Sequence, residues 1–488
     1  MTSIVSKMVY SVLLWGPPLL AASFATAQDL QRSPELAALM QRLDRQESEI
    51  RALQDQLRRP PETPFSQSST NALEKNLDAA GETSDVPEAS HGAKKAEIIT
   101  KPTFKVGGRI VADHLMIDQD PLHIASFGNA ANRTRFDSFR FNASGNIWEN
   151  LDYKAEIAFG EQGTNVDRPT AKDVYMTFLE LAYLQNVRIG HFKEPFSLDQ
   201  LTSALHITFM ERSLLDAFAP ARNMGIMEFG NVFPDETLSW YTGIFRTETD
   251  DDAVDELEDS ADFSWTSRVA WNPFYDEPSG GRYLMHLGAA YSFRRYGDDT
   301  VTIARDHEMN FVFPLGTPVA INFLGGPTVL ADEVQGFDAE AALIYGPLHT
   351  QAEWVHVTLD SPTEADFNAA YWEVAWFLTG EHKGYKKSMH VMDRPKVLEP
   401  FFSIRTGEGI CRGRGAWEVA ARYSYIDSND GGVNGGRVGD FTFGLNWYAN
   451  DHCRMMFNYI HGNAYSRPTS GTDAGECDEF GLRAQVDW

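Results

Sequence analysis

Apolar and polar residues alternate with a period of two in many segments after residue 103. In the final segment, Phe480, Leu482 and Val486 fall on one face, while Arg483 and Gln485 fall on the other. Successive side chains of a β-strand point to opposite faces, so the pattern predicts strands with one apolar and one charged face. A water-soluble sandwich shares the alternation, but runs of about ten residues with full charges on the polar face favour a membrane barrel.

The connections between these segments differ in length. Short turns are expected at residues 149–150, 234–236, 346–347 and 449–451, and long polar loops at 119–134, 247–261, 296–333, 428–438 and 462–477. Short turns on one side and long loops on the other are typical of outer-membrane barrels. We therefore predict an all-β fold, a transmembrane antiparallel β-barrel of about 16 strands that occupies residues 104–488. Segment 379–400 is then expected on the short-turn side.

One connection is far longer than a turn and rich in apolar residues. It lies between the alternating runs 187–193 and 224–233 and contains Phe196, Phe209 and Phe218. Long connections that carry apolar side chains are usually functional or folded inward. We therefore expect segment 189–225 to organise the interior of the barrel.

The first 103 residues show a different pattern. Lys7, an apolar run over residues 8–20 and the small residues Ala25 and Ala27 predict a signal peptide over residues 1–27. A capping Ser33 and a seven-residue repeat then predict a short coiled-coil helix within residues 28–60, with a lone amphipathic helix as the alternative. Residues 61–103 are rich in small and polar residues, which predicts a flexible linker.

Composition excludes several classes of function. The formal charge of -27 argues against nucleic-acid binding, because that function requires a basic patch. The sequence contains neither G-x-S-x-G nor H-E-x-x-H, so it gives no support to an enzyme. No cofactor or metal site is predicted, because the acidic loop 247–262 lacks the spacing of an EF-hand. Cys411, Cys453 and Cys477 do not make a disulfide framework, and no pairing is assigned.

Several stretches are similar to the phosphate-selective porin O and P family of Gram-negative outer-membrane porins. They begin at residues 189, 219, 271, 377 and 415 and read IGHFKEPFSLDQLTSALHITFMERS, APARNMGI, WNPFYDEPSGGRYLMHLGAAYSF, FLTGEHKGYKK and GAWEVAARYSYID. The resemblance covers residues 104–488. It implies an outer-membrane barrel of about 16 strands, usually a homotrimer, whose third external loop folds inward and narrows the pore. Segment 189–225 corresponds to that constriction loop.

The resemblance also implies a pore lined by arginines, with a lysine-containing phosphate site at the constriction. The candidates for anion contact in segment 189–225 are Lys193, His206, Arg212 and Arg222. The run 202–208 contains no Lys or Arg, which departs from that pattern. An anion needs fixed cationic donors and is repelled by carboxylates, so the mixed charge supports a narrowed channel more strongly than a phosphate-selective one.

Further arginines are candidate charges of the lumen. Arg135 and Arg140 cannot both face inward in an unbulged strand, because five residues of separation reverse the side. Arg422 and Arg483 lie on the polar faces of regular alternating runs. The candidates are Arg109, Arg133, Arg135, Arg140, Arg422 and Arg483.

The leading hypothesis is a porin for passive diffusion of small hydrophilic solutes, with a preference for anions such as phosphate. Its location is the outer membrane of a Gram-negative bacterium, and its expected partners are membrane lipid, lipopolysaccharide and further copies of the chain. The alternative is a structural barrel that the N-terminal coiled coil tethers to the periplasmic layer.

The signal peptide gives a direct prediction. Signal peptidase cleaves after a small-x-small motif, so the mature protein isolated from outer membranes should begin at Gln28. N-terminal sequencing or intact mass measures this directly. A mature chain that retains residues 8–20 would contradict the prediction and indicate an N-terminal anchor.

Overall fold

The computed structural model describes residues 102–159, 169–246, 263–295, 300–301, 329–362, 364–401, 404–406, 409–411, 413–466 and 475–488. The predicted signal peptide, coiled coil, linker and acidic loop lie outside these residues.

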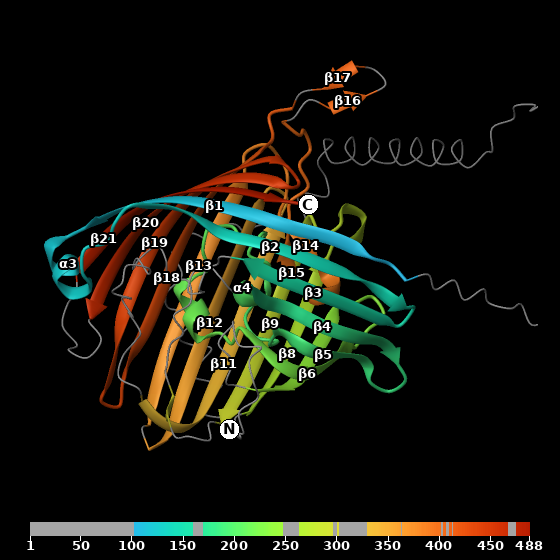
Figure 1. Cartoon of the computed structure of the whole chain (residues 1–488). Helices are drawn as coiled ribbons and strands as arrows, with labels where there is room; N and C mark the ends of the chain where they lie inside the picture. The colour runs from blue at the N-terminus through green and yellow to red at the C-terminus, as the bar shows by residue number, and fades with distance from the viewer. Residues whose placement is uncertain are drawn as a thin grey trace, which may run out of the picture. The chain divides into compact units, whose positions relative to one another are not determined.

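A closed antiparallel barrel of 16 strands forms the structure (Figure 1). β1 pairs with β2 on one side and with β21 on the other, which closes the sheet. The short β10 (Thr300–Val301) pairs with β11 at its edge. The predicted all-β antiparallel barrel of about 16 strands is therefore confirmed. The barrel strands are β1 (Lys105–Gln119), β2 (Arg133–Trp148), β3 (Leu151–Phe159), β4 (Thr170–Leu181), β5 (Gln185–Lys193), β6 (Arg222–Asn231), β7 (Leu238–Phe245), β8 (Phe263–Tyr275), β9 (Tyr283–Arg295), β11 (Val329–Tyr345), β12 (Leu348–Pro362), β13 (Ala365–Phe377), β18 (Ala416–Asp430), β19 (Val433–Asn450), β20 (Cys453–Ser466) and β21 (Gly475–Asp487).

Short elements occupy the connections. Among the described residues, no helix is long and apolar enough to cross a membrane. Figure 1 shows the β16–β17 hairpin projecting from the end of the barrel at which the C-terminus lies. The short elements are α3 (Pro121–Phe127), α4 (Leu198–Leu201), η3 (Leu214–Phe218), η4 (Glu277–Ser279), β14 (Gly384–Lys386), η5 (Lys387–Met389), β15 (Val391–Asp393), β16 (Ile404–Thr406) and β17 (Gly409–Cys411).

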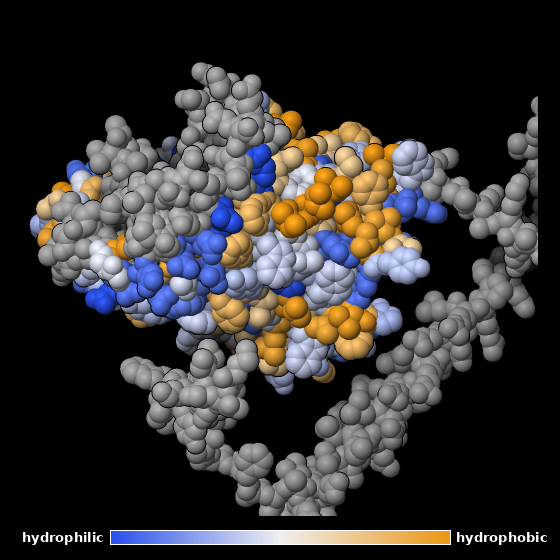
Figure 2. All heavy atoms as spheres, turned by 90° about the horizontal axis from the view of Figure 1, so that it is seen from below, coloured by the Kyte–Doolittle hydropathy of each residue, from blue (hydrophilic) through white to orange (hydrophobic). Residues whose placement is uncertain are grey.

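The barrel buries polar side chains and exposes apolar ones, which is the reverse of a protein that folds in water. On β21, Arg483 is 4% exposed, while its neighbour Leu482 is 45% exposed. The same alternation runs along the strand, with Gln485 buried and Val486 exposed. Figure 2 shows hydrophobic residues gathered on the outer surface of the barrel. An apolar outer band and a charged interior are the arrangement of a barrel that sits in lipid.

A β-bulge places Arg135 and Arg140, which a regular strand would separate, on the same side of β2. The register of β1 against β2 shifts between Val111 and Ala112, which leaves one extra residue, Asp137, in β2. Arg140 contacts Glu156 at 3.0 Å, and Arg135 lies 3.9 Å from the buried Asp113. Both arginines therefore face inward, because the bulge removes the alternation that would have separated them.

Most connections follow the predicted pattern, with two corrections. The turns at 149–150 and 346–347 are present, and the connection that contains 379–400 lies between β13 and β18, on the short-turn side. The long loop predicted at 428–438 is wrong, because β18 and β19 continue to a turn at Gly431 and Gly432. Both glycines have positive φ, 57° and 89°, which a two-residue hairpin turn requires. Likewise, β20 extends to Ser466 and β21 begins at Gly475, so the loop predicted at 462–477 is shorter.

Two of the three cysteines, Cys453 and Cys477, are free thiols.

The outward face of β21 provides a test of the lipid boundary. Leu482→Arg, near the middle of the strand, should destabilise the folded barrel in vesicles by about 2–4 kcal/mol, because a charge at the bilayer midplane is poorly solvated. Val486→Arg, near the end of the same strand, should cost about 0–1 kcal/mol. Urea unfolding in lipid vesicles measures both. Equal losses at the two positions would contradict this orientation of the strand.

Candidate functional site

The connection from β5 to β6, residues 194–221, is called loop L3 below. Its backbone carbonyls accept hydrogen bonds from arginines of the barrel wall. Arg454 donates to the Ile207 carbonyl at 2.8 Å, and Arg422 donates to the Glu211 carbonyl at 3.0 Å. Arg483 donates to the Met210 carbonyl. These carbonyls have no strand neighbour, so the wall supplies the donors that a buried backbone needs.

Carboxylates and hydroxyls of the wall satisfy the amides of loop L3. Glu353 on β12 accepts hydrogen bonds from the Leu198 amide at 2.9 Å and from the Asp199 amide at 2.7 Å. Ser424 on β18 accepts one from the Leu214 amide at 2.7 Å. Loop L3 is therefore held by side chains of β12 and of β18 to β21.

The apolar side of loop L3 packs on an apolar patch of the same wall. Figure 1 shows α4 of the loop among the strands of the barrel. Phe218 stacks on Phe367 of β13, with ring centroids 6.2 Å apart. The buried cluster joins Phe196, Met210, Leu214 and Leu215 of the loop to Val355, Phe367, Ile426, Val438 and Ile460 of five strands.

A second connection meets loop L3. Residues 378–397, called the inner segment below, follow β13 and contain β14 and β15. Lys383 donates to the His206 carbonyl of loop L3 at 2.6 Å, and the His206 ring lies 2.8 Å from Asp393. Burial lowers the pKa of both Lys383 and His206, so each binds its proton less tightly than in water.

Loop L3, the inner segment and strands of the first half of the barrel enclose a cavity of about 1060 Å³. Asn146, Asp152 and Asn231, beside the short turns, belong to its wall. Among the described lining residues, 10 are cationic and 6 are acidic. Arg268 is paired with Glu340, which does not line the cavity, so the other lining residues leave three positive charges in excess. The cationic residues are Lys105, Arg109, Arg140, Lys154, Arg188, Lys193, Arg212, Arg222, Arg268 and Lys386, and the acidic ones are Asp152, Glu156, Asp173, Asp216, Glu236 and Asp393.

Six of the candidates named from the sequence share this cavity: Lys193, His206, Arg212, Arg222, Arg109 and Arg140. Several of these cations contact carboxylates. Arg222 and Lys154 each lie 2.6 Å from Asp173, and Arg212 lies 3.6 Å from Asp216. Arg212 also donates to the Thr202 carbonyl at 2.7 Å.

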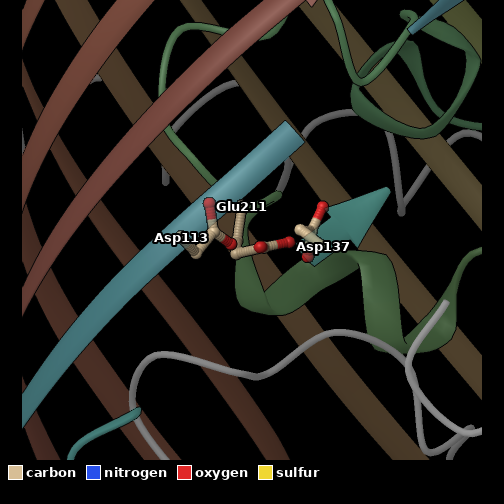
Figure 3. Close-up of side chains that lie close together, drawn as sticks. All are labelled: Asp113, Asp137 and Glu211. Carbon is tan, nitrogen blue, oxygen red and sulfur yellow. The ribbon is translucent and has the colours of Figure 1, made fainter. Parts of the chain in front are cut away.

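The other named arginines, Arg133, Arg135, Arg422 and Arg483, do not line this cavity. Arg483 lies among three carboxylates, at 2.8 Å from Asp113, 3.2 Å from Asp137 and 2.8 Å from Glu211. Figure 3 shows these three carboxylates turned toward one another from β1, β2 and loop L3. Arg422 lies over the Phe209 ring, 4.6 Å from its centroid.

Sequence reasoning did not select five cationic residues of the cavity wall, which are Lys105, Lys154, Arg188, Arg268 and Lys386. Lys154 lies on the polar face of an alternating strand, so alternation was a sufficient signal for it. Arg188 lies over the Tyr175 ring at 4.2 Å, and Arg268 lies on the inward face of β8. Lys386 reaches the cavity because the inner segment folds beside β8. Nothing in the local sequence indicates that packing.

A closed barrel with an apolar outer face, a charged interior and a cavity beside an interior loop defines the class of outer-membrane porins. Residues 104–488 match the family described as phosphate-selective porin O and P, and the chain belongs to this family. It is 27% identical to a protein of Caulobacter vibrioides over 373 residues, which are 73% of this chain and 68% of the relative.

Solved outer-membrane proteins resemble this chain in structure. The outer-membrane channel DcaP of Acinetobacter baumannii aligns with a TM-score of 0.48 and 11% identity, over 79% of this chain and 97% of DcaP. Pseudomonas putida OprB aligns with a TM-score of 0.49 and 10% identity, over 79% of this chain and 94% of OprB.

The Arg483 cluster generates a stability prediction. Arg483→Met should destabilise the barrel by about 3–5 kcal/mol, because it removes a cation that lies 2.8 Å from the buried Asp113 and Glu211 and leaves Asp113 the more distant Arg135 at 3.9 Å. Arg414→Met is the control, since Arg414 and Glu399 are largely exposed and 3.9 Å apart, and it should change stability by less than about 0.5 kcal/mol. Urea unfolding in vesicles compares the two. An Arg483→Met loss as small as that of the control would contradict the role assigned to this cluster.

Proposed function

We propose that this porin conducts small hydrophilic solutes passively and prefers anions such as phosphate. The observation that carries the proposal is the positive excess on the cavity wall. The whole chain has a formal charge of -27, so a wall with 10 cations and 6 acids is the reverse of the average composition. A lining of one sign raises the local concentration of ions of the opposite sign.

Loop L3 is the proposed constriction. Its hydrogen bonds reach β12, β18 and β21, and its buried phenylalanines pack on the wall, which supports a loop that crosses the interior. In this arrangement, solute passes beside the loop through the cavity, where Lys193, Arg212 and Arg222 face the path with His206.

The cations of the cavity are partly balanced by carboxylates, and this shapes the expected selectivity. Asp173 contacts both Arg222 and Lys154. Guanidinium and ammonium groups that already have carboxylate partners attract a passing anion without binding it tightly. A conducting site must release its ion as well as attract it. We therefore propose a modest anion preference rather than a tight phosphate trap.

Family membership supports three further proposals. The chain is exported by its signal peptide, assembles as a homotrimer, and contacts lipid and lipopolysaccharide through its apolar outer band. The predicted coiled coil in residues 28–60 would add to contact between subunits.

Planar-bilayer recording tests the proposal. Purified protein should give stepwise conductance, a reversal potential that reports anion preference in a KCl gradient, and partial block of chloride current by phosphate. Absence of conductance steps would contradict the channel, whereas cation preference would contradict only the proposed selectivity.

A charge reversal on the cavity wall tests which residues set the preference. Lys386→Glu makes an exposed position of the wall more negative by two charges. For an ion about 8 Å from this position in water, the change is worth about 1 kcal/mol, which should lower the anion-to-cation permeability ratio about fivefold. Lys396→Glu is the matched control, because Lys396 is exposed on the same segment but does not line the cavity. Equal effects of the two changes would show that the cavity charge does not determine selectivity.

A further inference from the structure

Three acidic side chains meet inside the barrel wall beside the first residues of loop L3. Asp338 and Glu340 lie two residues apart on β11, and Glu353 lies on β12. Each offers a carboxylate oxygen, and these three oxygens lie within 4.8 Å of one another. All three residues are buried, with exposed fractions of 0% for Asp338 and 3% for each glutamate.

The strand register forces two of these like charges together. Glu340 and Glu353 are direct partners across the β11–β12 hairpin. Like charges in directly opposed positions destabilise a sheet unless something neutralises them. Glu340 also lies over Gly288 on β9. A Cβ atom added to Gly288 would come within 2.4 Å of a carboxylate oxygen of Glu340. Any other residue at position 288 would displace Glu340, so the backbone is shaped around this carboxylate.

Two of the carboxylates have partners. Glu340 accepts hydrogen bonds from Arg268 at 2.5 and 3.0 Å. Glu353 accepts four hydrogen bonds, which come from the Ser197 hydroxyl, the Leu198 and Asp199 amides and the Tyr371 hydroxyl. A carboxylate that binds a metal ion is commonly hydrogen-bonded in this way by surrounding groups.

Asp338 differs from both glutamates. Neither of its carboxylate oxygens has a hydrogen bond of normal geometry among the described residues, although the side chain is fully buried and the Ser197 amide lies near it. A buried ionised carboxylate without a partner costs several kcal/mol. The other acidic cluster, Asp113 with Asp137 and Glu211, has no such deficit because Arg483 contacts all three residues.

We propose that Asp338, Glu340 and Glu353 bind one divalent cation, with Ca²⁺ the best match. The three carboxylates and Arg268 leave two negative charges, which one divalent ion neutralises. Oxygens that each lie 2.3–2.6 Å from a single Ca²⁺ are at most about 5 Å apart, and the cluster meets this limit. Ca²⁺ accepts irregular oxygen geometry and completes its shell with water, whereas Mg²⁺ requires a near-ideal octahedron.

The ion would connect the wall to loop L3. Glu353 belongs to the cluster and also accepts hydrogen bonds from the Leu198 and Asp199 amides. An ion that balances the charge of Glu353 would therefore stabilise the beginning of the loop. This inference does not depend on the proposed anion preference, since it concerns binding to the wall rather than conduction.

Equilibrium dialysis of the purified barrel with ⁴⁵Ca²⁺, after removal of metal with EDTA, tests the proposal. The wild-type protein should bind one more Ca²⁺ per chain than Asp338→Asn, which keeps the shape of the side chain and removes its charge. Loss of a ligand should weaken this site by at least about 100-fold, since loss of a surrounding partner alone costs about 10–100-fold. Asp137→Asn is the matched control and should bind as many ions as the wild type.

Equal Ca²⁺ binding by the wild type and Asp338→Asn would overturn the proposal and indicate that protons neutralise the cluster. A second measurement on the unmodified protein covers the case in which the variant does not fold. Tb³⁺ in the site should show emission sensitised by Tyr371, whose hydroxyl lies 2.5 Å from Glu353, and Ca²⁺ should displace it. The proposal would also be overturned if no sensitised emission appeared, or if Ca²⁺ did not remove it.

Discussion

Charged groups inside the barrel must be neutralised where they lie, because desolvating an isolated ion costs several kcal/mol. The outer face is apolar, so charged side chains of the strands turn inward, where loop L3 and the inner segment pack against the wall. Arg483 satisfies this requirement by contacting Asp113, Asp137 and Glu211. The Asp113–Arg483 pair also joins the first and last strands, so charge balance and closure of the sheet coincide.

The same requirement explains how loop L3 is held. A loop inside a barrel leaves carbonyls and amides without strand partners, and each needs a hydrogen bond. The wall provides cations to the carbonyls through Arg422 and Arg454, and an anion to the amides through Glu353. Arg422, Arg454 and Glu353 hold the loop without lining the cavity, whereas Arg212 lines the cavity and also donates to the Thr202 carbonyl of the loop. Only residues that line the cavity are positioned to act on a solute.

Much of the wall could be predicted from the sequence, because alternation depends only on neighbouring residues. Lys154 and Glu156 alternate with the apolar residues of segment 153–159, which predicts an inward direction for both, and both line the cavity. The turn at residues 346–347 also determines that Glu340 opposes Glu353, so this pairing of like charges was available from the sequence. The tight turn at Gly431 and Gly432 was mistaken for a long loop, because glycines with polar neighbours occur in tight turns and in long loops alike.

Other features could not be predicted, because they depend on distant parts of the chain. Arg483 and Asp113 are separated by 370 residues, and only closure of the barrel places them together. The bulge at Asp137 reverses the side expected for one arginine and leaves no clear sequence pattern. The role of Arg422 in holding loop L3 depends on the path of the loop. The alternation of β18 predicts that Arg422 faces inward but not which residues it contacts.

Loop L3 and the inner segment enter the barrel from opposite ends, since one joins β5 to β6 and the other joins β13 to β18. They meet where Lys383 reaches the His206 carbonyl and where His206 contacts Asp393. These few side chains join connections that enter from the two ends of the barrel. The two ends are therefore linked by direct contacts in the interior as well as by the strands.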